Sequence, residues 1–227
     1  MEGEETTLIQ AIHERHSVRR YVDSVLDVKS KATLSAAVEK INRESGLHIQ
    51  LVCDEEKAFS GLMARYGNFQ GVSNYIALIG KKSPDLSEKV GYYGEALVLL
   101  AQQIGLNTCW VGASYKRVPK AFTVGDGEKL VLVIAVGYGM GPGYPRKSKE
   151  PQRVSNVDAN SPKWFKEGVE AALLAPTAMN QQKFYFERVG DRVRLKAGTG
   201  AFAKVDKGIV KYHFEIGAGR ENFQWIE

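Results

Sequence analysis

The stretch GYYGEALVLLAQQIG, residues 91–105, gives the clearest helix pattern in the chain. Apolar side chains recur three and four positions apart along one face of an α-helix, at Tyr93, Ala96, Leu97, Leu100, Ala101 and Ile104. Val98 and Leu99 lie off this face and are apolar as well. We therefore expect a helix that is buried on most of its sides.

Helix and strand patterns alternate on both sides of this stretch. The spacing of apolar residues predicts further helices at residues 8–15, 30–46, 58–64, 162–175 and 207–216. Apolar runs predict strands at residues 47–53, 75–79 and 130–136, and a hairpin with a tight turn over residues 184–196. The segment 137–151, rich in Gly, Pro and Lys, is predicted to be a loop. This order is typical of an α+β or an α/β protein.

The composition is that of a globular protein. Apolar residues make up 44% of the 227 positions and charged residues 25%, which disfavours disorder and fibrous repeats. No run of about 18 apolar residues occurs, and the acidic start at residues 1–5 is unlike the basic start of a secretory signal. Cys53 and Cys109 form no CxxC pair, so neither a disulfide framework nor a zinc site is indicated. We expect a cytoplasmic protein without a metal site or a membrane-spanning segment.

The basic excess points to an anionic partner. The net charge is +5, from 31 Lys and Arg against 26 Asp and Glu, which suits a nucleic-acid-binding protein or one that binds a phosphorylated small molecule. The basic residues are scattered except at residues 15–20 and 146–153, and no long basic helix or zinc-finger spacing occurs. We favour a small anionic ligand and expect no nucleic-acid partner.

A weak internal repeat links the two ends of the chain. Gly94 and Gly208 are separated by 114 positions, and so are Gly105 and Gly219. A predicted helix and strand precede each member of the repeat, at residues 30–53 and 162–189. The coincidence is either chance or the trace of a duplication, which would give two half-domains packed as an internal pseudo-dimer.

The segment Arg15-His-Ser-Val-Arg19 is the first candidate site. If it is extended, alternation places Arg15, Ser17 and Arg19 on one face. Two guanidiniums around a hydroxyl would hold an anion, because arginine stays charged and donates in a fixed fork. The other interpretation is a solvated basic turn after a helix. A second basic stretch, residues 145–149, could close on a phosphate as a loop, although lysine-rich loops are common.

The segment Ala175-Pro-Thr-Ala-Met-Asn-Gln-Gln182 is a further candidate site. Pro176 ends a helix, and the residues after it present hydroxyl, backbone N–H and carboxamide groups that can bind the edge of a flat heterocycle or a polyol chain. The same groups could instead satisfy the backbone of a helix-to-strand connection. No Ser-His-Asp order, HExxH motif, phosphate-binding glycine loop or carboxylate pair is evident, so hydrolysis and phosphoryl transfer have little support.

Taken together, these segments resemble the nitroreductase family of flavin enzymes. The family's Arg-[Arg/His]-Ser-x-[Arg/Lys] motif is matched by residues 15–19, and its Ala-Pro-Ser-x-x-Asn-x-Gln motif by residues 175–182. Its apolar helix ending in Gly-Leu-x-x-x-Trp-x-Gly is similar to residues 91–112, and its late Pro-Arg-Lys stretch to residues 145–147. The resemblance spans most of the chain. It implies an α+β fold with a central, mainly antiparallel β-sheet flanked by helices.

The order of the motifs departs from that of ordinary family members. In those proteins the Ala-Pro-Ser segment comes early and reaches across a homodimer interface to the partner's FMN, whereas here it comes after residue 170. This order resembles a subgroup in which one chain imitates the dimer. It implies a first half at residues 1–150, with the Arg-Ser motif and the basic loop, and a shorter second half at residues 151–227. The halves would pack as one globular unit, present as a monomer or as a homodimer.

The resemblance also implies an FMN site. The residues expected at the phosphate, the ribityl chain and the pyrimidine edge are Arg15, His16, Ser17 and Arg19, with Arg146 and Lys147 at the phosphate and Asn68 at the pyrimidine edge. The residues expected beside the flavin ring are Trp110, Val111 and Gly112 from the first half and Pro176, Thr177, Ala178 and Asn180 from the second. Gln182-Lys183 replaces the usual Gln-Pro-Trp and alters the expected pocket wall.

The implied activity is that of an FMN-dependent oxidoreductase in which the flavin carries the chemistry and no side chain is catalytic. NADH or NADPH would supply hydride, and a flat small-molecule acceptor such as a nitroaromatic or a quinone would receive it. The alternative is a non-catalytic flavin or nucleotide binder, suggested by the altered wall at Lys183. A nucleic-acid-associated protein is suggested only by the net charge.

Overall fold

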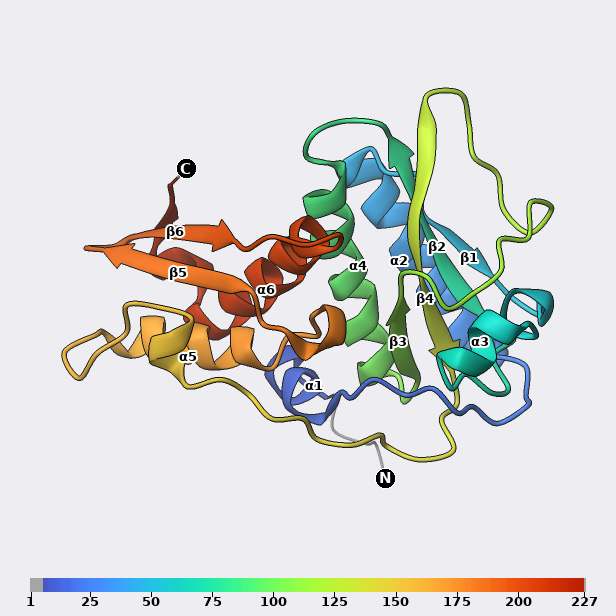
Figure 1. The fold of residues 1–227 in the computed structure, drawn as a ribbon, viewed down its shortest axis with the longest axis horizontal. Coiled ribbons are helices and arrows are strands. Elements are labelled where there is room, and N and C mark those ends of the chain that lie inside the picture. Colours follow the sequence, from blue (N-terminus) through green and yellow to red (C-terminus); the bar gives the residue numbers. More distant parts are fainter. Residues whose placement is uncertain (1–5, 227) are drawn as a thin grey trace.

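Figure 1 shows the protein in a computed structural model that describes residues 6–226. The acidic stretch at residues 1–5 lies outside the described residues, as does residue 227. The helices and strands are, in chain order, α1 (Leu8–Glu14), α2 (Val28–Ser45), β1 (Gln50–Val52), α3 (Leu62–Tyr66), β2 (Tyr75–Lys81), α4 (Leu86–Gln103), β3 (Asn107–Val111), β4 (Glu128–Gly137), α5 (Lys163–Leu173), β5 (Phe184–Val189), β6 (Arg192–Ala197), α6 (Ala203–Ala218) and β7 (Gln224–Trp225). Within the described range, no helix has the length and apolar character needed to cross a membrane.

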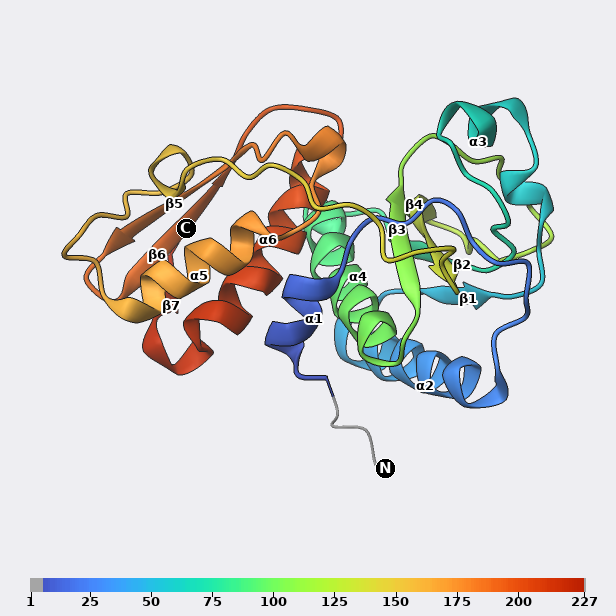
Figure 2. The same cartoon turned by 90° about the horizontal axis from the view of Figure 1, so that it is seen from below.

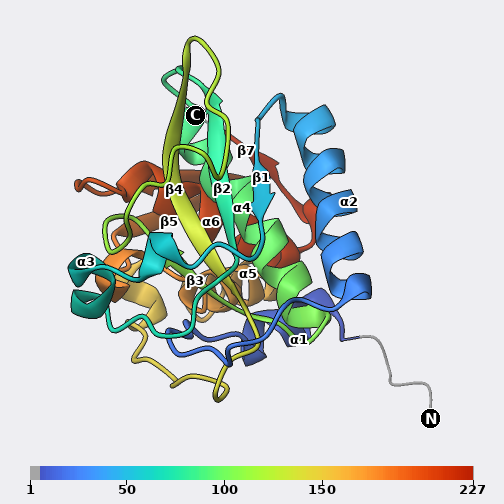
Figure 3. The same ribbon diagram turned by 90° about the vertical axis from the view of Figure 1, so that its right-hand side faces the viewer.

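The first half is built on an antiparallel sheet in the order β1-β2-β4-β3. Alternate residues of β2 face opposite sides, as the period of a strand requires. Ile76 and Leu78 join the core beneath α2 and α4, and Tyr75 and Ala77 join a smaller core on the other face. Figure 3 shows α2 on one side of this sheet and α3 on the other. The predicted mainly antiparallel sheet flanked by helices is confirmed.

Capping residues fix both ends of α2. The Asp27 carboxylate accepts the N–H groups of Lys29 and Ser30 at 2.9 and 3.0 Å, so the helix begins two residues before the predicted start. At the other end Gly46 adopts φ = 68°, a left-handed conformation that ends a helix at low cost when the residue is glycine. The predicted end at Gly46 is therefore confirmed.

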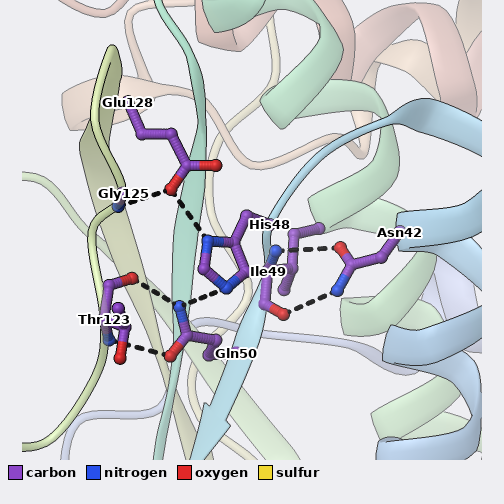
Figure 4. A network of polar contacts seen from close by, with 7 residues as sticks. All are labelled: Asn42, His48, Ile49, Gln50, Thr123, Gly125 and Glu128. Atoms are coloured by element: carbon purple, nitrogen blue, oxygen red, sulfur yellow. Dashed lines mark hydrogen bonds and ion pairs between the residues drawn. The ribbon is translucent and has the colours of Figure 1, made fainter.

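Side-chain hydrogen bonds tie the 121–125 segment to the edge strand β1 (Figure 4). The Gln50 carboxamide accepts the Thr123 N–H at 2.9 Å and donates to the Thr123 carbonyl oxygen at 2.6 Å. Next to it, His48 Nδ1 lies 2.8 Å from Glu128 Oε2, and this hydrogen bond is the largest cause that lowers the pKa of Glu128. The Asn42 carboxamide accepts the Ile49 N–H and donates to the Ile49 carbonyl oxygen, both at 2.8 Å, which occupies backbone groups that an edge strand would otherwise offer to another strand.

The second half carries a smaller sheet in the order β5-β6-β7, and Figure 1 shows its strands β5 and β6 beside α5 and α6. The hairpin between β5 and β6 turns at Gly190, with φ = 65°, as predicted from the Gly190-Asp191 pair. Its core is aromatic: the rings of Phe186 and Phe214 stack with centroids 4.5 Å apart, and the side chain of Trp225 packs on both.

Helices α4 and α6 cross in close contact between the two sheets (Figure 2). Glycines make the crossing possible, since a Cβ on Gly208 would lie 2.0 Å from the Glu88 carbonyl oxygen and one on Gly91 would lie 2.0 Å from the Val205 carbonyl oxygen. The crossing pair is thus Gly91 and Gly208, and Gly94 instead packs under the ring of Trp110. One continuous apolar core joins the residues of both halves across this contact.

The order of elements repeats along the chain. The series α2-β1-β2-α4-β3 has the same order as α5-β5-β6-α6-β7, apart from the short helix α3. Strands β2 and β3 are both antiparallel to β4 and so run parallel to each other. In the second half, whose described residues include no counterpart of β4, β7 pairs directly and in parallel with β6. Gly105 and Gly219, which follow α4 and α6, both have positive φ.

Several boundaries differ from the sequence-based predictions. Helices α4 and α6 begin earlier, at Leu86 and Ala203, and the strand expected at 47–53 is reduced to Gln50–Val52. The helix expected at 58–64 is wrong: Gly61 separates a 3₁₀ turn at Lys57–Phe59 from α3. Strands β3 and β7 were not predicted, because each depends on pairing with a strand far away in the sequence.

Candidate functional site

A cavity of about 530 Å³ lies between the first sheet and the second half of the chain. Distant segments form its walls: the chain after α1, the end of β3, the turn after α5 and the start of α6. The predicted site residues that line it are Ser17, Arg19, Trp110, Val111, Gly112, Pro176, Thr177 and Ala178. Its volume suits a small-molecule cofactor or substrate.

Backbone pairing with β3 fixes the segment that carries Ser17 and Arg19. Val18 donates its N–H to the Thr108 carbonyl oxygen at 3.0 Å, and Ser17 forms a β-bridge with Thr108. The Val18 side chain is buried in the smaller core. Because side chains alternate along an extended segment, the neighbours Ser17 and Arg19 reach the cavity instead.

The second-half wall is a turn with an unusual backbone. Met179, Asn180 and Gln182 adopt left-handed conformations with φ of 52°, 53° and 47°, which cost free energy for residues other than glycine. The buried Gln182 carboxamide holds the turn: it donates to the Leu173 carbonyl oxygen at 3.0 Å and accepts the Lys149 N–H at 2.8 Å. The pair Gln182-Lys183, which departs from the family's usual Gln-Pro-Trp, thus begins with a residue whose side chain holds the turn in place.

Two arginines meet at the end of α5. Arg15 Nη1 lies 3.3 Å from the Leu174 carbonyl oxygen, and the Arg146 guanidinium donates to the same oxygen. Arg15 is 4% exposed, and its Nε has no hydrogen-bond partner among residues 6–226. Burial and then the charge of Arg15 lower the pKa of Arg146 to about 10. The unpartnered Arg15 Nε and the two neighbouring positive charges of Arg15 and Arg146 would both be stabilised by a bound anionic group.

The basic loop is hydrogen-bonded to the second half. Asn180 Nδ2 donates to the Lys147 carbonyl oxygen at 2.8 Å, and Lys149 Nζ donates to the Gln182 carbonyl oxygen at 2.9 Å. Ser148 Oγ donates to a carbonyl oxygen at the end of α5 at 3.2 Å. These contacts set Arg146 beside the turn that lines the cavity.

Six predicted site residues lie outside the cavity lining: Arg15, His16, Asn68, Arg146, Lys147 and Asn180. Asn68 lines an adjoining hollow of about 290 Å³, which shares Arg19 and the Trp110–Gly112 segment with the cavity. Burial, followed by the charges of Arg15 and Arg146, lowers the pKa of the half-buried His16. His16 therefore belongs with the arginine pair rather than with the cavity wall.

Asp206 and Phe202 line the cavity but were missed by the sequence analysis. The Asp206 carboxylate accepts the Ala178 N–H, with both oxygens at 3.1 Å. It is 8% exposed, and burial raises its pKa to about 6, against the lowering effect of the Ala178 hydrogen bond. The helical spacing of Asp206, Ile209 and His213, which share one buried face of α6, could have indicated that Asp206 is buried. The predicted helix began at residue 207 and therefore left Asp206 out.

A buried polar network lies on the other side of Trp110. Trp110 Nε1 donates to Glu95 Oε2 at 2.8 Å, and His213 Nε2 lies 2.8 Å from Glu95 Oε1. Glu95 and His213 are fully buried and belong to α4 and α6, so their contact joins the two halves. Burial lowers the pKa of Arg15, and the charge of Glu95 partly opposes that shift.

Comparison with known proteins assigns this chain to a family. The family model described as "Putative TM nitroreductase" matches residues 7–218. The chain belongs to this nitroreductase family. Membership gives the broad functional class of oxidoreductases. No curated protein sequence matches the chain.

Solved structures share the nitroreductase fold. A protein from Thermotoga maritima, described as a putative nitroreductase, matches with a TM-score of 0.71 and 21% identity over 100% of this chain and 91% of its own. A second, from Desulfovibrio desulfuricans and in complex with FMN, matches with a TM-score of 0.53 and 18% identity over 70% of this chain and 99% of its own. A third, from Parabacteroides distasonis and named as an NADH dehydrogenase/NAD(P)H nitroreductase, matches with a TM-score of 0.51 and 20% identity over 68% of this chain and 98% of its own. At these identities the likeness is one of fold.

Proposed function

We propose that the protein is an FMN-dependent oxidoreductase that passes hydride from NADH or NADPH to a flat acceptor such as a nitroaromatic or a quinone. One observation carries the proposal: Ser17 and Arg19 line the same cavity as Pro176, Thr177 and Ala178. The FMN-bound neighbour supports the cofactor, and the name of the Parabacteroides relative supports a nicotinamide donor.

The arginine pair suits the phosphate of FMN. A phosphate offers several anionic oxygens to the Arg15 and Arg146 guanidiniums, one of which has a buried and unpartnered Nε. Charge-assisted hydrogen bonds from arginine to phosphate are stronger than neutral ones and are often bidentate. Both guanidiniums donate to the Leu174 carbonyl oxygen, and Leu174 lies two residues before Pro176, where the cavity wall begins. We assign His16 and Lys147 to the same phosphate end.

The cavity walls suit the flavin ring. The wall from Trp110 to Gly112 offers backbone groups beside an apolar wall made of Phe202, Val205 and Ile209. A Cβ on Gly112 would lie 2.3 Å from the Phe202 ring, so only glycine lets the two walls approach this closely. We assign Asn68, in the adjoining hollow, to the pyrimidine edge, and Asn180 to the support of the turn.

The protein would contribute placement, charge and shielding. Bound FMN supplies the hydride chemistry. Arg19 holds a positive charge at the first-half wall and would stabilise negative charge at the pyrimidine edge. Phe202, Val205 and Ile209 would exclude water from the ring, while the cavity stays open to a flat molecule.

We also propose that the chain is an internal pseudo-dimer, with halves at residues 1–150 and 151–227. The repeated order of elements and the crossing of α4 and α6 support this division. The second half would then provide within one chain what a partner subunit provides in an ordinary dimer. The cytoplasmic location and the absence of a nucleic-acid partner stay predictions.

An FMN titration tests the proposal. The purified, flavin-free protein should shift the visible absorbance bands of added FMN, and the complex should then oxidise NADH or NADPH when a quinone is present. Absence of any band shift would contradict the proposal. FMN binding without nucleotide oxidation by any acceptor would favour the non-catalytic flavin binder.

A further inference from the structure

Asp206 is a buried carboxyl group in the wall of the cavity. Its side chain is 8% exposed, and within residues 6–226 its two oxygens share a single donor, the Ala178 N–H, at 3.1 Å each. One N–H cannot satisfy the acceptor sites of two carboxylate oxygens. Part of the carboxyl group is therefore free to meet a ligand in the cavity that Asp206 lines.

No cation pairs with Asp206 in the part of the chain that the structure describes. On α6, Lys207 Nζ lies 2.8 Å from Glu88 of α4, and Lys204 Nζ reaches the Pro84 carbonyl oxygen at 3.3 Å. Two cations, Arg19 and Lys183, line the same cavity, but Asp206 forms an ion pair with neither of them. Cys109 also lines the cavity. Glu95 faces His213 and Trp110 on the far side of α4.

An unpaired, buried carboxyl group favours its neutral form, because burial penalises the charge. Burial raises the pKa of Asp206 to about 6. Below that pH the group carries a proton into the cavity, and above it the proton is lost. A carboxyl group whose pKa lies near the working pH is suited to give up a proton during a reaction.

The proposed activity needs such a proton. Reduction of a quinone by two electrons adds a hydride and a proton, and the flavin of the proposed function supplies only the hydride. We propose that Asp206 is a catalytic residue that donates this proton to an oxygen of a neutral flat acceptor. The inference rests on the proposed function and adds a chemical role to a residue of its second-half wall.

The step balances in atoms and charge. The O–H bond of Asp206 breaks, and an O–H bond forms on one oxygen of the quinone. Hydride from the flavin accounts for the other hydrogen and both electrons, so the quinone leaves as a hydroquinone. The Asp206 carboxylate then takes a proton from water, while Ala178 keeps the carboxyl group in place in both states.

The test compares two acceptors on the FMN-loaded protein. 1,4-Benzoquinone needs a proton with its electrons, whereas ferricyanide takes an electron and no proton. In the wild type, kcat/KM for benzoquinone should fall as the pH rises above 6, and that for ferricyanide should not follow this fall. Asp206→Asn keeps an oxygen for the Ala178 N–H but cannot act as an acid. It should lower kcat/KM for benzoquinone about 100-fold and remove its pH dependence, and it should not lower kcat/KM for ferricyanide to a comparable degree.

Two controls separate the possible outcomes. Asp85→Asn removes a surface carboxylate outside the cavity whose pKa is lowered by its hydrogen bonds, so this variant should behave as the wild type with both acceptors. In the flavin-free protein, the infrared C=O stretch of a protonated carboxyl group should titrate near pH 6 and be absent from Asp206→Asn. This second readout does not depend on turnover.

Equal losses with benzoquinone and ferricyanide would show that Asp206 only supports the wall, and no loss with benzoquinone would also overturn the proposal. An Asp206→Asn spectrum that keeps the titrating C=O band would do the same. A wild-type protein that binds no FMN and reduces neither acceptor would instead overturn the proposed function, and the proton-donor role with it.

Discussion

Arg15 and Arg146 donate to one acceptor, the backbone carbonyl oxygen of Leu174, although they come from opposite ends of the first half. One neutral oxygen cannot balance two cations of which one is buried and the other half-buried. The arrangement therefore gains most when an anion binds beside it. The same carbonyl belongs to the residue that precedes the Ala175–Pro176 step, so the anion site and the cavity wall are joined through the backbone.

Replacing either cation should weaken FMN binding more than it weakens the fold. Arg15→Gln and Arg146→Gln each remove charge-assisted hydrogen bonds, and we expect FMN affinity to fall about 10- to 100-fold. The thermal midpoint of the flavin-free protein should change little, because loss of one charge relieves the repulsion between the pair. Arg20→Gln, which removes an exposed cation from the same segment, is the matched control. An equal loss of midpoint in the flavin-free variants would mean that the arginines are structural.

Asn180 should support the flavin site through the turn. Its side chain donates to the Lys147 carbonyl oxygen at 2.8 Å, and its backbone has φ = 53°. Asn180→Ala loses the hydrogen bond and adds about 1 kcal/mol of left-handed strain, so both stability and FMN affinity should fall while the protein stays in solution. Asn180→Gly loses the hydrogen bond without the strain and separates the two effects. Unchanged FMN affinity in both variants would remove Asn180 from the site.

The free energy of unfolding of the flavin-free protein should depend on pH because of Asp206. A carboxyl group whose pKa is raised from 3.8 to about 6 on folding binds more protons in the folded state between these values, so its contribution to stability falls as the pH rises through that range. Asp206→Asn removes this loss. The free energy of unfolding of the variant, relative to wild type, should therefore rise by about 2 kcal/mol between pH 4 and pH 6.5. Denaturant unfolding across this range checks it, and parallel curves would contradict the account.

The close crossing of α4 and α6 should not accept a side chain at its glycines. A Cβ on Gly208 would lie 2.0 Å from the Glu88 carbonyl oxygen and 2.6 Å from the Tyr92 nitrogen, both backbone atoms. Gly208→Ala should thus destabilise the protein by about 3 kcal/mol or more. Gly61→Ala, where a Cβ would meet nothing within 4 Å, is the control. A thermal midpoint for Gly208→Ala equal to that of the control would mean that the helices do not pack this closely.

Local patterns predicted much of the fold. The apolar stripe of residues 91–105, the cap at Gly46 and the turn at Gly190 depend on neighbouring residues, and the structure has all three. Strand β3 depends on β4, from which it is distant in the sequence, and its own residues show no alternation of apolar and polar side chains. The crossing pair Gly91 and Gly208 likewise could not be read from the spacing of the repeat.

The motif residues of the site were predicted from the sequence, but the contacts that hold them in place were not. Residues 15–19 and 175–182 were marked by residue type, but the shared acceptor of Arg15 and Arg146 depends on the path of the chain through both halves. Asp206 was missed because it lies one residue before the predicted start of the helix, which was four residues too late. In the structure α6 begins at Ala203, so Asp206 lies on the buried face of the helix with Ile209 and His213.

Native mass spectrometry of the protein mixed with FMN tests the central claim most directly, because it reports the number of chains and of flavins in each particle. We predict one FMN for each chain of 25.1 kDa, in particles of one chain or of two, since both walls of the site come from one polypeptide. Chains without FMN, or one FMN shared between two chains, would contradict this prediction.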